Sequence, residues 1–147
     1  MNIKLLEKNY VNIDIKPTNI GYDKNGNYKL FDMNLLLKLE KNEFNKKINL
    51  CKKYNYYYLH PVTNIIPQNI ISYSVAILIL EAFSTNYECK AYLYEPKKIY
   101  HSKFVLLNLK KRLIGTQLFK ILHICLSGNY PPNELLQKLI EIYQIYK

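Results

Sequence analysis

Residues 12–34 read NIDIKPTNIGYDKNGNYKLFDMN and carry the clearest local signals in the chain. Two short alternating segments, 20–22 and 28–31, flank the polar sequence DKNGN at residues 23–27. Asn-Gly at the centre of such a connection is typical of a tight hairpin turn, because both residues tolerate a positive φ. The sequence therefore predicts a β-hairpin over residues 20–31.

Four polar residues flank this hairpin, Asp14, Lys16 and Asn19 before it and Asp32 after it. Paired strands fold the chain back on itself, so we expect all four near one end of the hairpin. Phosphoryl transfer uses such a set: one carboxylate accepts a hydroxyl proton, a carboxylate and an amide hold Mg²⁺, and a lysine neutralises charge on the phosphoryl group. The alternative is a polar turn before a hairpin, with Asp32 as an acid at a strand end.

At these positions the sequence resembles the protein kinase family. Residues 5–19 (LLEKNYVNIDIKPTN) resemble the end of a helix followed by the catalytic loop H-R-D-x-K-P-x-N, and Asp32-Met33-Asn34 stands where D-F-G is expected. Residues 58–62 are similar to the A-P-E segment, residues 72–81 to the large buried helix after it, and residues 125–136 to the closing helices. The resemblance covers nearly the whole chain and is sharpest around the catalytic loop.

The resemblance implies serine/threonine kinase chemistry, in which phosphate passes from ATP to protein hydroxyls. By this resemblance Asp14 is the catalytic base and Lys16 is the lysine that contacts phosphate. Asn19 and Asp32 are the implied Mg²⁺ ligands, with Asp32 the main one. Mg²⁺ and ATP are the implied cofactors.

The resemblance is to the C-terminal lobe of a kinase, because residues 1–147 show no Gly-rich phosphate loop, strand lysine, pairing glutamate or hinge. The implied partners are a protein substrate, a partner kinase or a separately encoded N-terminal lobe. We expect phosphotransfer by this chain alone to be weak or absent.

Some positions depart from the family pattern. Asn12 and Ile13 replace the His and Arg of H-R-D, and Met33-Asn34 replace Phe-Gly. Ile71 or Ser72 occupies the place of the aspartate that braces the catalytic loop. Three functions stay open: a truncated kinase, a pseudokinase-type interaction module that binds or inhibits another kinase, and a basic nucleic-acid-binding protein.

The composition fits one folded domain, with 147 residues of which 49% are hydrophobic and 22% charged. The net charge of +10 comes almost entirely from lysine, since Arg112 is the only arginine. Specific phosphate and base recognition favours arginine, and the lysines are scattered in pairs, so the charge does not favour nucleic acid as the main partner.

Targeting and cysteine signals point to a protein of the cytoplasm. Cys51, Cys89 and Cys125 have neither C-x-x-C spacing nor the pattern of a disulfide framework. The first residues are charged and contain no apolar signal core. The longest apolar run, residues 70–83, is shorter than the ~20 residues of a membrane span and predicts a buried helix.

The remaining pattern is mainly helical. Predicted helices cover residues 70–84, 103–113, 117–126 and 134–146. The last helix is expected to be capped by Asn133. Its apolar stripe consists of Leu135, Leu136, Leu139, Ile140 and Tyr143.

The predicted fold is a mainly α, α+β domain that resembles a kinase C-terminal lobe, with a small hairpin carrying the catalytic loop and then a helical bundle. One domain spans residues 1–147. The catalytic and Mg²⁺ loops occupy residues 1–34, an activation-segment-like loop occupies 35–62, and a helical subdomain occupies 63–147. Within the middle part, residues 35–58 are predicted as a long loop.

Overall fold

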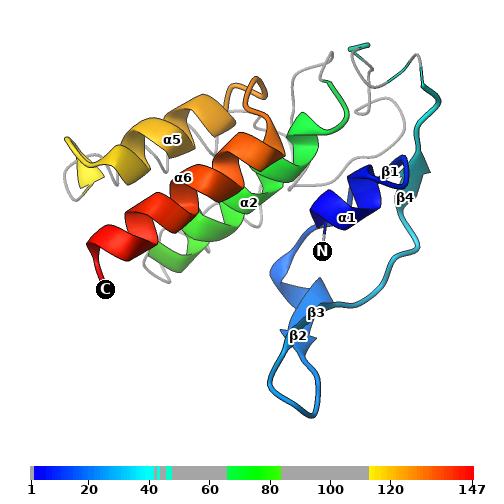
Figure 1. The fold of residues 1–147 in the computed structure, drawn as a ribbon, viewed down its shortest axis with the longest axis horizontal. Coiled ribbons are helices and arrows are strands. Elements are labelled where there is room, and N and C mark those ends of the chain that lie inside the picture. The colour runs from blue at the N-terminus through cyan, green and yellow to red at the C-terminus, as the bar shows by residue number, and fades with distance from the viewer. Residues whose placement is uncertain (1, 42, 44–45, 48–65, 84–112) are drawn as a thin grey trace, which may run out of the picture.

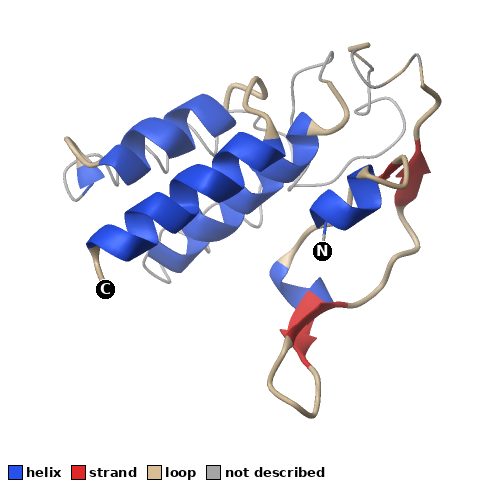
Figure 2. Ribbon diagram, viewed as in Figure 1, coloured by secondary structure: helices blue, strands red, loops and turns tan. Residues whose placement is uncertain are grey.

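The computed structural model describes residues 2–41, 43, 46–47, 66–83 and 113–147. Within these residues the chain forms four α-helices and two small antiparallel sheets, an α+β arrangement (Figures 1 and 2). The elements in chain order are α1 (Asn2–Leu6), β1 (Tyr10–Asn12), the 3₁₀ turn η1 (Pro17–Asn19), β2 (Ile20–Tyr22), β3 (Tyr28–Leu30), β4 (Leu36–Lys38), α2 (Asn69–Phe83), α5 (Gln117–Cys125) and α6 (Pro132–Ile145).

The predicted hairpin is confirmed. Strands β2 and β3 pair in antiparallel fashion around a turn in which Gly26 has a φ of 78°. The Asp23 carboxylate closes this turn, because its Oδ1 accepts a hydrogen bond of 2.9 Å from the backbone N–H of Asn27. Figure 1 shows the hairpin projecting from the rest of the chain.

Acid is expected to loosen this turn. The pKa of Asp23 is lowered mainly by the N–H that Asn27 donates to it. A lowered folded-state pKa means that the stabilisation is present above the unfolded value of about 3.9 and is lost as pH falls through the folded-state pKa. We expect the Asn27 amide to exchange with solvent faster below about pH 4, after correction for intrinsic exchange. The variant Asp23→Asn should lack this pH dependence, and an identical dependence in that variant would contradict the assignment.

A second sheet was not predicted. Residues 35–58 were expected to form a long loop, the first part of the activation-segment-like segment, but Leu36–Lys38 form strand β4 and pair with β1. The physical reason is burial: Val11 on β1 is 0% exposed, and Leu39 just after β4 is 2% exposed. Apart from residues 35–41, 43 and 46–47, the predicted loop lies outside the described residues.

Helix α2 confirms the predicted buried helix and joins two apolar clusters. At its first turn, Ile70 and Ile71 pack with Val11, Ile13 and Ile15 of the N-terminal part. Farther along, its side chains pack against α5 and α6 in a second cluster. Helix α2 therefore packs against both the segment that contains Ile13 and Ile15 and the helices α5 and α6.

Helix α5 matches the predicted helix 117–126, whereas the predicted start of α6 is wrong. Pro131 is the N-cap of α6 and its side chain makes no capping hydrogen bond. Pro132 occupies the first helical position, where proline fits because it has no N–H to satisfy. Asn133 therefore lies inside the first turn and does not cap the helix.

The predicted apolar stripe of α6 is correct only in part. Leu135 is buried and Leu139 packs against the helical cluster, but Leu136, Ile140 and Tyr143 are exposed. Ile142 is buried instead. Apolar residues occupy more than one side of this helix, so the neighbouring helices decide which side faces the core. The predicted helix 103–113 lies outside the described residues except for its last residue.

Two further sequence predictions can be compared with the structure. Cys125 is a free, buried thiol, and burial raises its pKa to about 12, whereas Cys51 and Cys89 lie outside the described residues. In the described parts of the chain, no helix is both long enough and apolar enough to cross a membrane.

Candidate phosphoryl-transfer site

The loop between β1 and β2 is anchored by alternating side chains. Ile13 and Ile15 are 1% and 2% exposed and pack on Ile70 and Ile71 at the start of α2. Asp14, between them, is not a member of this apolar cluster and makes its side-chain contacts with Lys16 and Asn19 of the loop.

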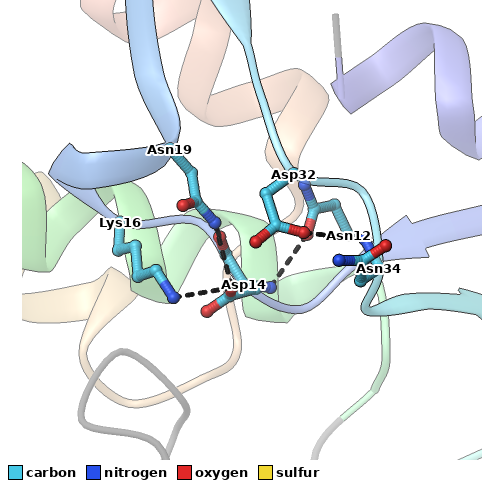
Figure 3. Close-up of polar contacts among 6 residues, drawn as sticks. All are labelled: Asn12, Asp14, Lys16, Asn19, Asp32 and Asn34. Carbon is cyan, nitrogen blue, oxygen red and sulfur yellow. Dashed lines mark hydrogen bonds and ion pairs between the residues drawn. The ribbon is translucent and has the colours of Figure 1, made fainter.

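Asp14 is the centre of the polar contacts in this loop. Its Oδ2 accepts hydrogen bonds from Lys16 Nζ at 2.8 Å and from Asn19 Nδ2 at 2.9 Å (Figure 3). Asn19 Nδ2 also donates to the backbone oxygen of Asp14 at 3.0 Å. Asp14 and Asn19 are each 5% exposed. The structure thus brings three of the four predicted site residues into direct contact.

The turn η1 presents Asn19 to Asp14. Pro17 occupies its first position, where the fixed φ of proline favours a helical turn. The backbone N–H of Asn19 donates to the Lys16 oxygen at 3.0 Å. This short turn reverses the chain between Lys16 and β2, so both Lys16 and Asn19 can reach the Asp14 carboxylate.

Asp32 is held beside this loop by backbone hydrogen bonds. The N–H of Phe31 donates to the Asn19 oxygen at 2.7 Å, and the N–H of Ile13 donates to the Leu35 oxygen at 3.1 Å. Asp32 lies between these two attachment points. Figure 3 shows its carboxylate directed toward the loop that carries Asp14 and Asn19.

The conformation of Asp32 is unusual and locally supported. Its φ is 52°, in the left-handed region that aspartate and asparagine enter more readily than most residues. Its Oδ1 accepts from the backbone N–H of Asn34 at 3.2 Å. Asp32 is exposed, in contrast to Asp14 and Asn19. The fourth predicted residue is therefore adjacent to the cluster and accessible from solvent.

The oxygen atoms available here suit Mg²⁺. In proteins this ion is commonly held by one or two carboxylates together with substrate phosphates. Asp32 offers an exposed carboxylate, and Asn19, whose Nδ2 is engaged by Asp14, has Oδ1 as its remaining polar side-chain atom. Among the described residues no three His, Cys, Asp or Glu side chains gather as a metal-ion site. Asp32 and Asn19 therefore offer oxygen donors of the chemical type that Mg²⁺ takes.

Sequence reasoning missed the role of Asn12, which was considered only as a replacement for histidine. Its side chain is 0% exposed, and its Oδ1 accepts from the Asp14 N–H at 2.8 Å. The available signal was an asparagine two residues before the key aspartate, a spacing at which Asn commonly bonds the backbone.

The bracing position on α2 contributes no polar contact that the structure shows. Ile71 belongs to the apolar cluster under the loop. The Ser72 hydroxyl is buried and has no hydrogen-bond partner within the described part of the chain. The loop and the first turn of α2 share one apolar cluster.

Comparisons of this chain with protein-family models, with characterised proteins and with solved structures found no match.

Proposed function

We propose that this chain is a protein-kinase-like C-terminal lobe that supplies the base and the Mg²⁺ ligands of a phosphoryl-transfer site. The observation that carries the proposal is the Asp14 carboxylate, which is buried and bonded to both Lys16 and Asn19. Asp32 lies beside them because the N–H of Phe31 is bonded to the oxygen of Asn19. Asp14, Lys16 and Asn19 thus lie in one loop, and Asp32 lies in the segment that is hydrogen-bonded to it.

In this proposal Asp14 accepts the proton of a serine or threonine hydroxyl on a protein substrate. Its Oδ2 is engaged by Lys16 and Asn19, which fixes the carboxylate and leaves Oδ1 to face the hydroxyl. Phosphoryl transfer depends mainly on positioning and charge stabilisation, so a fixed carboxylate is an advantage. Lys16, whose side chain is 30% exposed, can reach the transferred phosphoryl group while remaining next to Asp14.

Asn19 and Asp32 are the residues that would hold Mg²⁺. When bound, the ion neutralises charge on the phosphates of ATP. The adenine and the remaining phosphate contacts must come from other residues, because the four glycines, at 21, 26, 115 and 128, do not form a Gly-rich phosphate loop. We therefore propose that a nucleotide-binding lobe, joined to this chain or separate from it, completes the site.

Thermal unfolding with and without Mg-ATP tests this proposal. A ligand at 100 times its dissociation constant stabilises a protein by about 2.7 kcal/mol. For a chain of this length such a gain raises the melting temperature by roughly 5–10 °C. We expect Mg-ATP to produce this shift at saturating concentration, and we expect Asp32→Asn to remove it because a neutral amide binds the cation more weakly than a carboxylate.

Asp23→Asn is the matched control. Asp23 also accepts a backbone N–H from the residue two positions later, but it lies in the hairpin turn, away from the Asp14 loop. The control should retain the full Mg-ATP shift. An equal shift in Asp32→Asn would contradict the role of Asp32 as a cation ligand. No shift in the unsubstituted chain would mean that these residues hold no nucleotide without a second lobe.

A second candidate is an interaction module that binds another kinase or its substrate, and the exposed hairpin favours it. The register pairs Ile20 with Leu30 and Tyr22 with Tyr28, which places these side chains on one face. Ile20, Tyr22 and Tyr28 are 37%, 62% and 70% exposed. Tyrosine is enriched at the energetically important positions of protein interfaces. Absence of any Mg-ATP shift would favour this candidate.

A further inference from the structure

Asn12 carries a buried side chain that is hydrogen-bonded to the backbone of Asp14. It is the last residue of β1 and is 0% exposed. Its Oδ1 accepts from the Asp14 N–H, whereas its Nδ2 has no hydrogen-bond partner among the described residues. A buried polar group without a partner lowers stability, so an apolar side chain of similar shape would suit this position better for folding alone.

The bond from Asp14 to Asn12 fixes the direction of the chain where the strand ends. An Asn side chain that accepts the N–H two residues later mimics a backbone turn. The preceding N–H, that of Ile13, is bonded to Leu35 across the sheet. Asn12 therefore turns the backbone away from the sheet at Asp14, the residue whose carboxylate meets Lys16 and Asn19.

Both backbone polar groups of Asp14 are held by asparagine side chains. Asn12 accepts from its N–H at 2.8 Å, and Asn19 donates to its oxygen at 3.0 Å. The peptide units on either side of the Asp14 Cα are thus restrained from opposite ends of the loop. Helix α2 adds apolar packing from Ile70 and Ile71 but no such bond through the Ser72 hydroxyl.

We propose that Asn12 is a positioning residue that sets the Asp14 carboxylate by holding the Asp14 backbone amide. It acts from within the loop, beside the apolar packing that Ile70 and Ile71 of α2 provide. The consequence for nucleotide-dependent chemistry rests on the proposed function, but the effect on the Asp14 backbone does not.

Amide hydrogen exchange at Asp14, measured by NMR in the folded chain, tests the inference. In Asn12→Leu the acceptor is lost while the branching at Cγ is kept, and we expect exchange at Asp14 to be about three- to tenfold faster. In Asn12→Asp an oxygen acceptor remains at this position, and exchange should stay within about twofold of the unsubstituted chain. Asn12→Ala replaces Asn12→Leu if leucine prevents folding.

Asn69→Leu is the matched control for a general loss of stability. Asn69 is also a buried asparagine, its Oδ1 has no partner in the described part of the chain, and its Nδ2 donates to the Gly128 oxygen at 3.0 Å. It lies at the start of α2 and is not bonded to Asp14. Compared at equal free energy of unfolding, set by added urea, this variant should leave Asp14 exchange unchanged.

Three outcomes overturn the inference. One is an Asp14 amide that exchanges at the unprotected rate in the unsubstituted chain. Another is an Asp14 exchange rate that Asn12→Leu leaves unchanged. The third is acceleration of equal size in Asn12→Leu, Asn12→Asp and Asn69→Leu. The Mg-ATP shift distinguishes this failure from that of the proposed function: Asn12→Leu should weaken apparent nucleotide affinity by about three- to tenfold, with recovery in Asn12→Asp. A chain without any shift holds no nucleotide without a second lobe, and Asp14 exchange still decides the role of Asn12.

Discussion

Asp14→Asn is expected to lower phosphotransfer to a protein hydroxyl by about 10²–10⁴-fold, the usual contribution of a positioned general base. The carboxylate is the proposed proton acceptor, and an amide cannot accept that proton at neutral pH. The fold should survive this change. An asparagine can place its Oδ1 where Asp14 Oδ2 now accepts from Lys16 and Asn19.

The measurement is transfer of the labelled γ-phosphate of ATP to a serine-containing protein acceptor, with circular dichroism to confirm folding. Asp23→Asn serves as the control, because it makes the same chemical change in the exposed hairpin turn. A folded Asp14→Asn variant that keeps the rate of the unsubstituted chain would show that Asp14 is not the base. An unsubstituted chain with no measurable transfer, even with an added nucleotide-binding lobe, would favour the interaction module.

Local chemistry allowed the hairpin and much of the site to be predicted. The Asn-Gly turn signal is contained in a few consecutive residues, and strands β2 and β3 lie on either side of it. Asp14, Lys16 and Asn19 are close in sequence, so a short turn at Pro17 is enough to bring them together. The kinase family itself remains a prediction that rests on these motifs.

Features that depend on distant contacts were not predicted. Strands β1 and β4 have three residues each and are separated by the whole hairpin, so neither shows a periodic pattern of its own. The burial of Asn12, which is 0% exposed at the end of β1, likewise arises only in the folded chain. From the sequence, Asn12 could be described only as a replacement for the histidine of the H-R-D pattern.

The side of helix α6 that faces the core was also not predicted correctly from the sequence. Its sequence contains apolar residues on two sides, and the predicted stripe combined both. Leu135 and Ile142 face the core, whereas Leu136 is 48% exposed. The choice between the two sides is made by packing against α2 and α5, which the sequence of α6 does not encode locally.

This orientation leads to a prediction about stability. Leu122 on α5 is 0% exposed and belongs to the cluster formed by α2, α5 and α6. Leu122→Ala removes buried methyl groups and leaves a cavity, so we expect a loss of about 2–5 kcal/mol in the free energy of unfolding. Urea denaturation followed by circular dichroism measures this change.

Leu136→Ala is the matched control, because it makes the same substitution on the exposed side of α6. A surface substitution of this kind usually changes stability by about 0.5 kcal/mol or less. Equal losses in the two variants would mean that α6 faces the core with Leu136, as the sequence pattern suggested.

Because α2 contributes to both apolar clusters, Leu122→Ala should also speed exchange of the Asp14 amide if the chain unfolds as one cooperative unit. Faster exchange at Asp14 in this variant would link the helical core directly to the order of the proposed site.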